Sequence, residues 1–209
     1  MVGENQRAKG FRNPRLGRAS SFGQGAVPLL GLSQTQQFAK QEFARAKRYD
    51  YPLTIGVCCL DRIDRLADLY GAETRTLLMD QLARLFHARS RTTDIVGRIG
   101  EDRLLWVLPH TPLVGARVAA DRLLEAIEDL ELASGSRTLR VTLSVGFACY
   151  VDRNTLFLDS VLAQAEAALL RAQDRGGNRV EWHPLPVHTP EQVEDTENEE
   201  RRDGDVEPA

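Results

Sequence analysis

Cysteine and long apolar runs are scarce in this sequence, and each scarcity excludes a class of protein. The three cysteines, Cys58, Cys59 and Cys149, are odd in number and lack CxxC spacing, which excludes a disulfide scaffold and a zinc ribbon. No run approaches the roughly 18 apolar residues of a membrane-spanning helix. The first twenty residues include no apolar stretch typical of a secretory signal. We therefore expect a cytoplasmic protein with no membrane partner.

The middle of the chain also lacks a net charge. Residues 1–18 carry five basic residues against one acid, residues 187–209 carry nine acids against two arginines, and the remainder is neutral in sum. Because a nucleic-acid-binding domain carries a basic patch, we expect no nucleic-acid partner. Low apolar content predicts a disordered basic arm over residues 1–26 and a disordered acidic tail over 183–209, which leaves 27–182 as one domain.

Within the domain, the spacing of the hydrophobic residues changes several times between that of a helix and that of a strand. Helical spacing predicts a helix through QTQQFAKQEFARAKRY, capped by Ser33 with Phe38 and Phe43 on its buried side. Further helices are expected on either side of Tyr70–Gly71, at Leu113–Leu130 and at Leu156–Arg175. Strands are expected at Leu53–Leu60, as a hairpin around Gly100, along LRVTLSVGFACYV and at NRVEW. This interleaving predicts an α/β fold with a central mixed sheet covered by helices.

Five strings within residues 27–182 resemble motifs of the GGDEF domain, the diguanylate cyclase module of bacterial signalling. PLLGLSQTQQF is similar to D-x-L-T-G-L-x-N-R-x-x-F, with Val27 in place of the aspartate. RYDYPLTIGVCCL resembles the first helix end and strand, and RTTDIVGRIGEDRLLWVLPHT the signature hairpin. VTLSVGFA resembles V-T-x-S-I-G-x-A, and AEAALLRAQDRGGNRV resembles A-D-x-A-L-Y-x-A-K-x-x-G-R-N-R-V. The resemblance implies the palm-like nucleotidyl-cyclase fold, a mixed five-stranded sheet plus a hairpin, flanked by helices.

The resemblance also implies a chemistry, in which a homodimer holding one GTP and Mg²⁺ in each subunit condenses two GTP to cyclic di-GMP. Phosphoryl transfer of this kind depends on positioned metal carboxylates and cations. Aligned on Tyr70–Gly71, most of the family's positions for these groups are changed here. The changed residues are Cys59 at the first metal aspartate, Ala67 and Thr76 at the guanine-reading positions, and Gln173 and Gly177 at the triphosphate-holding lysine and arginine.

The signature pentad becomes Gly100 to Leu104, in which Asp102 keeps the third-position acid and Arg103 replaces the following glutamate. A register shifted by two would place Asp61, and not Cys59, at the metal position, but it would displace apolar residues from the family's apolar positions. In either register Arg103 reverses a charge at the centre of the reaction. We therefore expect no cyclase activity and no Mg²⁺ cofactor.

Family members often carry an inhibitory R-x-x-D motif that binds cyclic di-GMP with a second arginine from the helix after the hairpin. Arg91 and Asp94 stand at the expected distance before Gly100, and Arg122 stands at the second arginine. An arginine fork suits phosphate or guanine O6 and N7, and a carboxylate accepts from guanine N–H groups. The same pattern recurs at Arg65–Asp68, Arg171–Asp174 and Arg202–Asp205, so only its position distinguishes it. The plain alternative is an exposed ion pair.

Three functions remain open at this point. The preferred hypothesis is a catalytically inactive GGDEF-like domain that binds cyclic di-GMP at Arg91, Asp94 and Arg122 and signals to an unknown protein partner. The alternative is a protein-interaction module that binds no nucleotide. The third is an enzyme with residual cyclase activity. Binding of cyclic di-GMP separates the first two, and product formation from GTP identifies the third.

Overall fold

The structure is a computed structural model that describes residues 29–184, apart from 129–130, 135–136 and 151–156. The predicted arm and nearly all of the predicted tail lie outside these residues. The elements in chain order are α1 (Leu32–Tyr49), β1 (Leu53–Leu60), α2 (Ile63–Tyr70), α3 (Ala72–Arg89), β2 (Ile95–Arg98), β3 (Arg103–Pro109), α4 (Leu113–Glu128), β4 (Glu131–Ser134), β5 (Arg137–Arg140), β6 (Leu143–Tyr150), α5 (Leu158–Asp174) and β7 (Val180–Trp182). None of the helices in the described ranges is both long and apolar enough to cross a bilayer.

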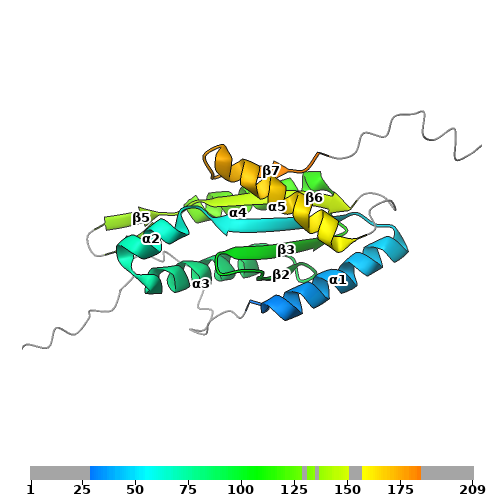
Figure 1. Ribbon diagram of the computed structural model, residues 1–209, viewed down its shortest axis with the longest axis horizontal. Helices are drawn as coiled ribbons and strands as arrows, with labels where there is room; N and C mark the ends of the chain where they lie inside the picture. Colours follow the sequence, from blue (N-terminus) through cyan, green and yellow to red (C-terminus); the bar gives the residue numbers. More distant parts are fainter. Residues whose placement is uncertain (1–28, 129–130, 135–136, 151–156, 185–209) are drawn as a thin grey trace, which may run out of the picture.

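Five strands form a central mixed sheet in the order β2-β3-β1-β6-β7 (Figure 1). Strand β1 pairs antiparallel with β3 and β6, β2 pairs antiparallel with β3, and β7 runs parallel to β6. The predicted α/β fold with a mixed five-stranded sheet is therefore confirmed. The predicted hairpin around Gly100 is β2–β3 and belongs to this sheet.

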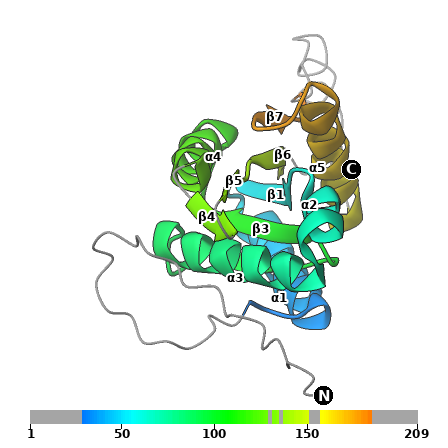
Figure 2. The same ribbon diagram turned by 90° about the vertical axis from the view of Figure 1, so that its left-hand side faces the viewer.

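Helices cover both faces of the sheet, with α3 and α4 on one face and α1 and α5 on the other (Figure 2). Because side chains alternate along a strand, neighbours in β1 enter different cores. Cys58 packs with α3 and α4, whereas Cys59 packs with α1 and α5. All eight residues of β1 are buried, as the continuous apolar run LTIGVCCL predicts for a central strand.

One long strand was predicted along LRVTLSVGFACYV, and the structure divides it. Strand β6 begins at Leu143, which pairs with Leu60 at the end of β1. Beyond that pair β1 turns into α2, with one further backbone hydrogen bond from the Asp61 N–H to the Thr142 carbonyl. Leu139 and Arg140 of the predicted strand pair instead with β4 in a separate two-stranded sheet. This second pairing was not predicted.

The predicted helix cap at Ser33 is wrong, because α1 begins at Leu32, two residues before the predicted start at Gln34, with Gly31 as its N-cap and no capping side chain. Thr35 instead donates its hydroxyl to the carbonyls of Leu30 and Gly31, at 3.2 and 2.8 Å. Leu30 pairs in turn with Gly97 of β2. A Cβ at Gly97 would lie 1.9 Å from Thr35 Oγ1, so glycine permits this close approach.

Phe38 was predicted on the buried side of α1, but it is 41% exposed. The buried stripe of the helix consists of Thr35, Ala39, Glu42, Phe43 and Ala46, which recur at helical spacing. Phe43 is therefore correctly predicted, whereas Phe38 lies beside the stripe.

Candidate functional site

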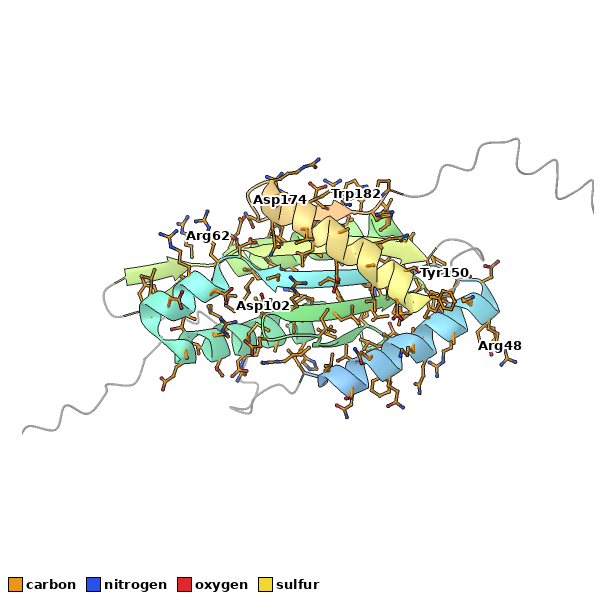
Figure 3. All side chains as sticks on the ribbon, viewed as in Figure 1. Arg48, Arg62, Asp102, Tyr150, Asp174 and Trp182 are labelled. Atoms are coloured by element: carbon orange, nitrogen blue, oxygen red, sulfur yellow. The ribbon has the colours of Figure 1, made fainter. Side chains whose placement is uncertain are left out.

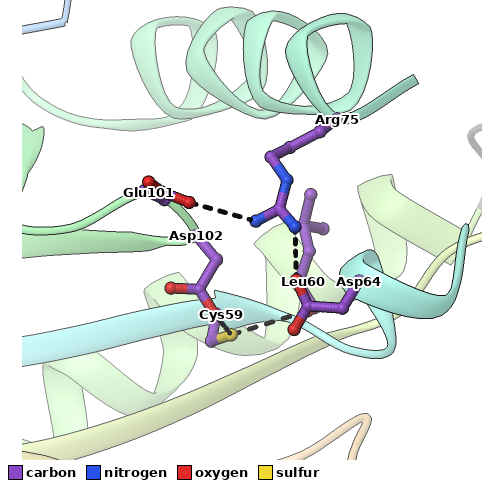
Figure 4. Close-up of polar contacts among 6 residues, drawn as sticks. All are labelled: Cys59, Leu60, Asp64, Arg75, Glu101 and Asp102. Carbon is purple, nitrogen blue, oxygen red and sulfur yellow. Dashed lines mark hydrogen bonds and ion pairs between the residues drawn. The ribbon is translucent and has the colours of Figure 1, made fainter. Parts of the chain in front are cut away.

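Three residues at the family's catalytic positions, Cys59, Asp102 and Arg103, lie at one end of the sheet, where β1 ends and β3 begins. Asp102 and Arg62 lie toward this end, and Tyr150 lies at the other (Figure 3). Cys59 is paired with Arg103 across the two strands. The Cys59 thiol donates toward Asp102, with Sγ 3.6 Å from Oδ2 (Figure 4).

The Cys59 thiol is protonated at neutral pH. Burial is the largest cause that raises the pKa of Cys59 to about 12, and the negative charge of Asp102 adds to it. Only a thiolate would be a metal ligand. Within the described ranges, no group of three or more histidine, cysteine, aspartate or glutamate side chains could hold a metal ion.

A cation from α3 lies across this end of the sheet. The Arg75 guanidinium pairs with Asp64 of α2 and lies 4.0 Å from a carboxylate oxygen of Glu101 in the hairpin turn (Figure 4). The sequence analysis did not identify Arg75, because its spacing in α3 does not show that the side chain reaches over to α2 and the turn. Asp64 and Glu101 are therefore both paired with the Arg75 cation.

Asp61 was considered as an alternative metal ligand, but its carboxylate accepts three hydrogen bonds from other parts of the chain. The donors are Thr142 Oγ1 at 2.8 Å, Ser144 Oγ at 2.6 Å and the backbone N–H of Asn178 at 2.9 Å. Asp61 therefore fastens the end of β1 to β6 and to the loop before β7. Asp102 is the retained acid of the signature, and the side chain of β1 that lies beside it is Cys59. This arrangement favours the alignment that places Cys59 at the first metal position over the one that places Asp61 there.

Gly177, at the family's phosphate-holding arginine, lies directly against Asp61. Its φ is +76°, and a Cβ there would lie 2.8 Å from the Asp61 carboxylate. The remaining changed positions are scattered over three helices: Ala67 in α2, Thr76 on the exposed side of α3 and Gln173 near the end of α5. They add no charged group to the site.

Arg91 and Asp94 lie in the loop between α3 and β2, at the opposite end of the hairpin from Gly100. The Arg91 backbone N–H donates to Asp94 Oδ2 at 2.8 Å, and the Asp94 N–H donates to the Arg91 carbonyl at 3.0 Å. The Arg91 side chain is exposed and makes no ion pair with the described residues. The two side chains therefore do not form the exposed ion pair that was the plain alternative.

A cavity of about 550 Å³ adjoins this loop. Its walls come from the segment before α1, from α1, from the end of α3, from the loop and from β2: Leu29, Leu30, Phe38, Ala83, Phe86, His87, Ser90, Arg91, Thr92, Asp94, Ile95 and Val96. The volume lies within the range of small-molecule sites, and both polar and apolar side chains line the cavity. The sequence did not predict the cavity.

Ser90 and Asp94, which border the cavity, each have one buried polar atom without a hydrogen-bond partner among the described residues, Ser90 Oγ and Asp94 Oδ1. Burial raises the pKa of Asp94, against the lowering effects of the Arg91 backbone N–H, the Arg91 charge and the indole of Trp106. The indole N–H of Trp106 does not reach hydrogen-bond geometry and is itself unpartnered. Buried polar groups without partners are uncommon and point to a water or a ligand.

Arg122, the third residue of the predicted ligand site, is exposed on α4 and is not part of the cavity lining. No hydrogen bond or ion pair joins it to Arg91 or Asp94, all three of which lie in the described part of the chain. Because α4 packs beside α3, Arg122 lies on the helix next to the one that ends at the loop.

Comparisons with known proteins agree on one family. The profile of the family described as "Diguanylate cyclase, GGDEF domain" matches residues 32–179. Diguanylate cyclase DosC of Escherichia coli K12 is 27% identical over 143 residues, which are 68% of this chain and 31% of that protein. The chain thus spans about a third of the length of such curated relatives.

Solved structures show the same fold. The GGDEF domain of DgcB from Caulobacter crescentus, in complex with c-di-GMP, superposes with a TM-score of 0.71 at 18% identity and covers 79% of this chain and 98% of that one. The diguanylate cyclase SiaD from Pseudomonas aeruginosa, in complex with its activator SiaC, superposes with a TM-score of 0.69 at 24% identity, covering 74% of this chain and 58% of that one.

Proposed function

Since this chain belongs to the GGDEF domain family, we propose that it is a catalytically inactive member that binds cyclic di-GMP. Arg91 and Asp94 are the main ligand-binding residues, and Arg122 is an additional one. The bound state is read by a protein partner. The observation that carries the proposal is a contrast between two sites. At the catalytic end Arg75 pairs with Asp64 and Glu101 and a thiol lies beside Asp102, whereas the Arg91 guanidinium in the ligand loop is exposed and has no ion pair among the described residues.

The donor set at the catalytic end does not fit Mg²⁺. This cation prefers oxygen ligands and usually binds through one or two carboxylates plus substrate phosphates. Here a protonated thiol stands beside the single carboxylate of Asp102, and Arg103 follows in the chain. A soft, neutral thiol is a poor ligand for a hard cation.

The catalytic end also lacks groups that would hold GTP. Cys59, Ala67 and Thr76 cannot supply the family's carboxylate and amide contacts, and Gly177 supplies no cation. Loss of one preorganised electrostatic group commonly costs on the order of 10²–10³ in rate. Several such losses together remove cyclase activity.

The loop after α3 suits an anionic guanine ligand. The exposed Arg91 guanidinium can give forked hydrogen bonds to phosphate or to guanine O6 and N7. One oxygen of Asp94 accepts from the Arg91 N–H, and a carboxylate is the group that accepts from the guanine N–H edge. The cyclic di-GMP present in the DgcB structure makes this dinucleotide the ligand to test first.

The deciding experiment is calorimetric titration of the nucleotide-free protein with cyclic di-GMP, GTP and GDP. Since a hydrogen bond to a charged group contributes about 1.5–3 kcal/mol, Arg91→Ala should weaken binding roughly 10- to 100-fold. Arg122→Ala should have a smaller effect, because Arg122 lies outside the cavity.

The matched control is Arg65→Ala, which removes the arginine of another R-x-x-D pattern and should leave binding unchanged. Bound ligand stabilises only the folded protein, so thermal melting supplies an independent measurement. If neither method responds at high micromolar cyclic di-GMP, the receptor function is wrong, and a protein-interaction module takes its place.

A further inference from the structure

Helix α1 presents a basic ridge to the outside of the molecule. Lys40, Ala44 and Arg48 recur at every fourth position, so they lie along one side of the helix, and all three are exposed. Neither Lys40 nor Arg48 makes an ion pair with the described residues. The single acid of the helix, Glu42, is buried and accepts a hydrogen bond from Tyr51. The basic ridge therefore has a cation at each end and a small residue at its centre.

Helix α5 presents an acidic ridge with the same spacing. Glu166, Leu170 and Asp174 are all exposed, and Leu170 is 52% exposed although it is a large apolar residue. Neither acid makes an ion pair with the described residues. The single cation of the helix, Arg171, donates to the Trp182 carbonyl at 3.2 Å. The acidic ridge thus matches the basic ridge in spacing and opposes it in charge.

The two ridges belong to neighbouring helices on one side of the molecule. Helices α1 and α5 both cover the same face of the sheet (Figure 1). A groove of about 370 Å³ lies between them and is bordered by Lys40 and Glu166. Arg48 and Asp174, at the far ends of the ridges, lie well apart in Figure 3. The opposite charges of the two ridges are therefore not used on each other within the chain.

We propose that this α1–α5 face binds a second copy of the chain, with the basic ridge of each copy against the acidic ridge of the other. A two-fold symmetric interface uses one surface patch on both copies, so a patch with both charges is complementary to itself. The association goes beyond the proposed function, and its surface includes neither the catalytic positions Cys59 and Asp102 nor the ligand loop at Arg91.

The spacing of the ridges fits direct helix packing. Ridges of residues four apart pack against one another in the commonest class of helix contact. Leu170 of one copy can rest on the small Ala44 of the other. Since four residues rise about 6 Å in either helix, both acids then lie opposite cations, whichever way the helices run. The apolar centre and charged ends match the usual layout of a protein interface.

Sedimentation velocity of the full chain without nucleotide, over a series up to high micromolar concentration, measures this association. Lys40→Glu with Arg48→Glu makes both ridges acidic, and Glu166→Lys with Asp174→Lys makes both ridges basic. Because like charges then face each other, each variant should self-associate at least about 10-fold more weakly than the wild type. An equimolar mixture of the two variants should form a heterodimer, because every acidic ridge again meets a basic one.

The matched controls reverse exposed charges outside both ridges. They are Arg65→Glu with Arg89→Glu, and Asp68→Lys with Glu125→Lys, on α2, α3 and α4. Each control has the same net charge as one of the ridge variants and should self-associate as the wild type does. Wild-type association should also weaken as salt is added, because salt screens exposed charges.

A second pair of variants tests the apolar centre. Leu170→Ala should weaken self-association by roughly 10-fold, since the contact occurs twice in a symmetric dimer. Val114→Ala, which truncates a residue that is 77% exposed on α4, should have no effect. The inference is overturned if the wild type stays monomeric, if the ridge variants associate as the wild type does, if their mixture forms no heterodimer, or if the controls lose association too. Cyclic di-GMP binding is measured separately, so either proposal can fail without the other.

Discussion

The two ends of the β2–β3 hairpin differ in what their polar groups contact. At the tip, Arg75 pairs with Asp64 and Glu101, and the Cys59 thiol contacts Asp102. At the base, next to the cavity, Ser90 Oγ and Asp94 Oδ1 are buried without a hydrogen-bond partner among the described residues, and the Arg91 guanidinium is exposed without an ion pair among them. Two acids at the tip are thus paired with a cation of the chain, whereas the Arg91 guanidinium at the base is accessible to another molecule.

Under the proposed function, the catalytic centre is lost while the side chains around it stay bonded to one another. Asp61 holds Thr142, Ser144 and the loop at Asn178 at the end of the sheet where the family holds triphosphate. These residues are part of the internal bonding of the fold. Ligand recognition is then to be sought where internal bonding is incomplete.

The largest predicted effect is the absence of cyclase activity at the tip of the hairpin. We predict that the purified protein forms no cyclic di-GMP from GTP with Mg²⁺ or Mn²⁺, and that Arg103→Glu alone does not restore activity. Each missing electrostatic group contributes on the order of 10²–10³ in rate, so one reversion is insufficient. Nucleotide chromatography of long incubations, with an active diguanylate cyclase assayed in parallel, measures the product. Steady product formation by the wild type would show that the tip still binds GTP productively.

The next effect concerns the thiol beside Asp102. With a pKa of about 12, Cys59 has a far smaller thiolate fraction at pH 8 than an ordinary cysteine. We predict that iodoacetamide modifies it more slowly than a free thiol by on the order of 10³. Mass spectrometry of the alkylated peptide, with the urea-unfolded chain as control, gives the rates. Rapid modification of the folded protein at pH 8 would show an exposed thiolate and would reopen the question of a metal ligand.

The next prediction concerns the contribution of Asp61 to the free energy of unfolding. Asp61→Ala removes an acceptor of three hydrogen bonds and leaves the buried Ser144 hydroxyl unpartnered. We expect the free energy of unfolding to fall by about 2–4 kcal/mol, measured by urea denaturation. Asp64→Ala is the control, since its pair with Arg75 is exposed and contributes little. Equal stability of the two variants would show that Asp61 does not fasten the sheet.

The smallest predicted change in stability has the opposite sign, at the base of the hairpin. Burial raises the pKa of Asp94, so its negative charge destabilises the fold, and stability from this group increases as the pH falls through that pKa. Asp94→Asn can keep the acceptor for the Arg91 N–H without the charge. We expect an equal or slightly higher melting temperature at pH 7, together with weaker cyclic di-GMP binding.

The pH dependence of ligand binding provides the control for this prediction. Wild-type affinity should decrease on acidification at a pH above the usual aspartate range, because the carboxylate must be ionised to accept from guanine. Asp94→Asn should lack that dependence. A variant that melts lower and binds unchanged would show that Asp94 is a structural residue.

The parts of the fold that depend on local patterns were predictable from the sequence. The apolar run Leu53–Leu60 is a central strand, and the helices divide at Tyr70–Gly71 as expected. The alignment of Cys59 with Asp102 followed from the family motifs. The position of the start of α1 was not predictable in this way, because Thr35 is placed by its contact with Gly97 of a distant strand.

The features that distinguish the two ends of the hairpin depend on long-range contacts. Asp61 bonds to residues 81, 83 and 117 positions away. The cavity needs the segment before α1, the end of α3 and β2 to meet, and no single stretch of sequence contains that arrangement. The hydrogen-bonding state of Ser90 likewise depends on packing around it.

The contact between Gly177 and Asp61 has a consequence for protein engineering and for evolution. Any larger residue at position 177, including an arginine, would place a Cβ 2.8 Å from the Asp61 carboxylate unless the loop moves. A substitution that restores one phosphate contact would therefore disturb the hydrogen bonds joining β1 to β6. Positions 177 and 61 are therefore coupled, so a side chain at 177 is accommodated only together with a change at Asp61 or in the loop before β7.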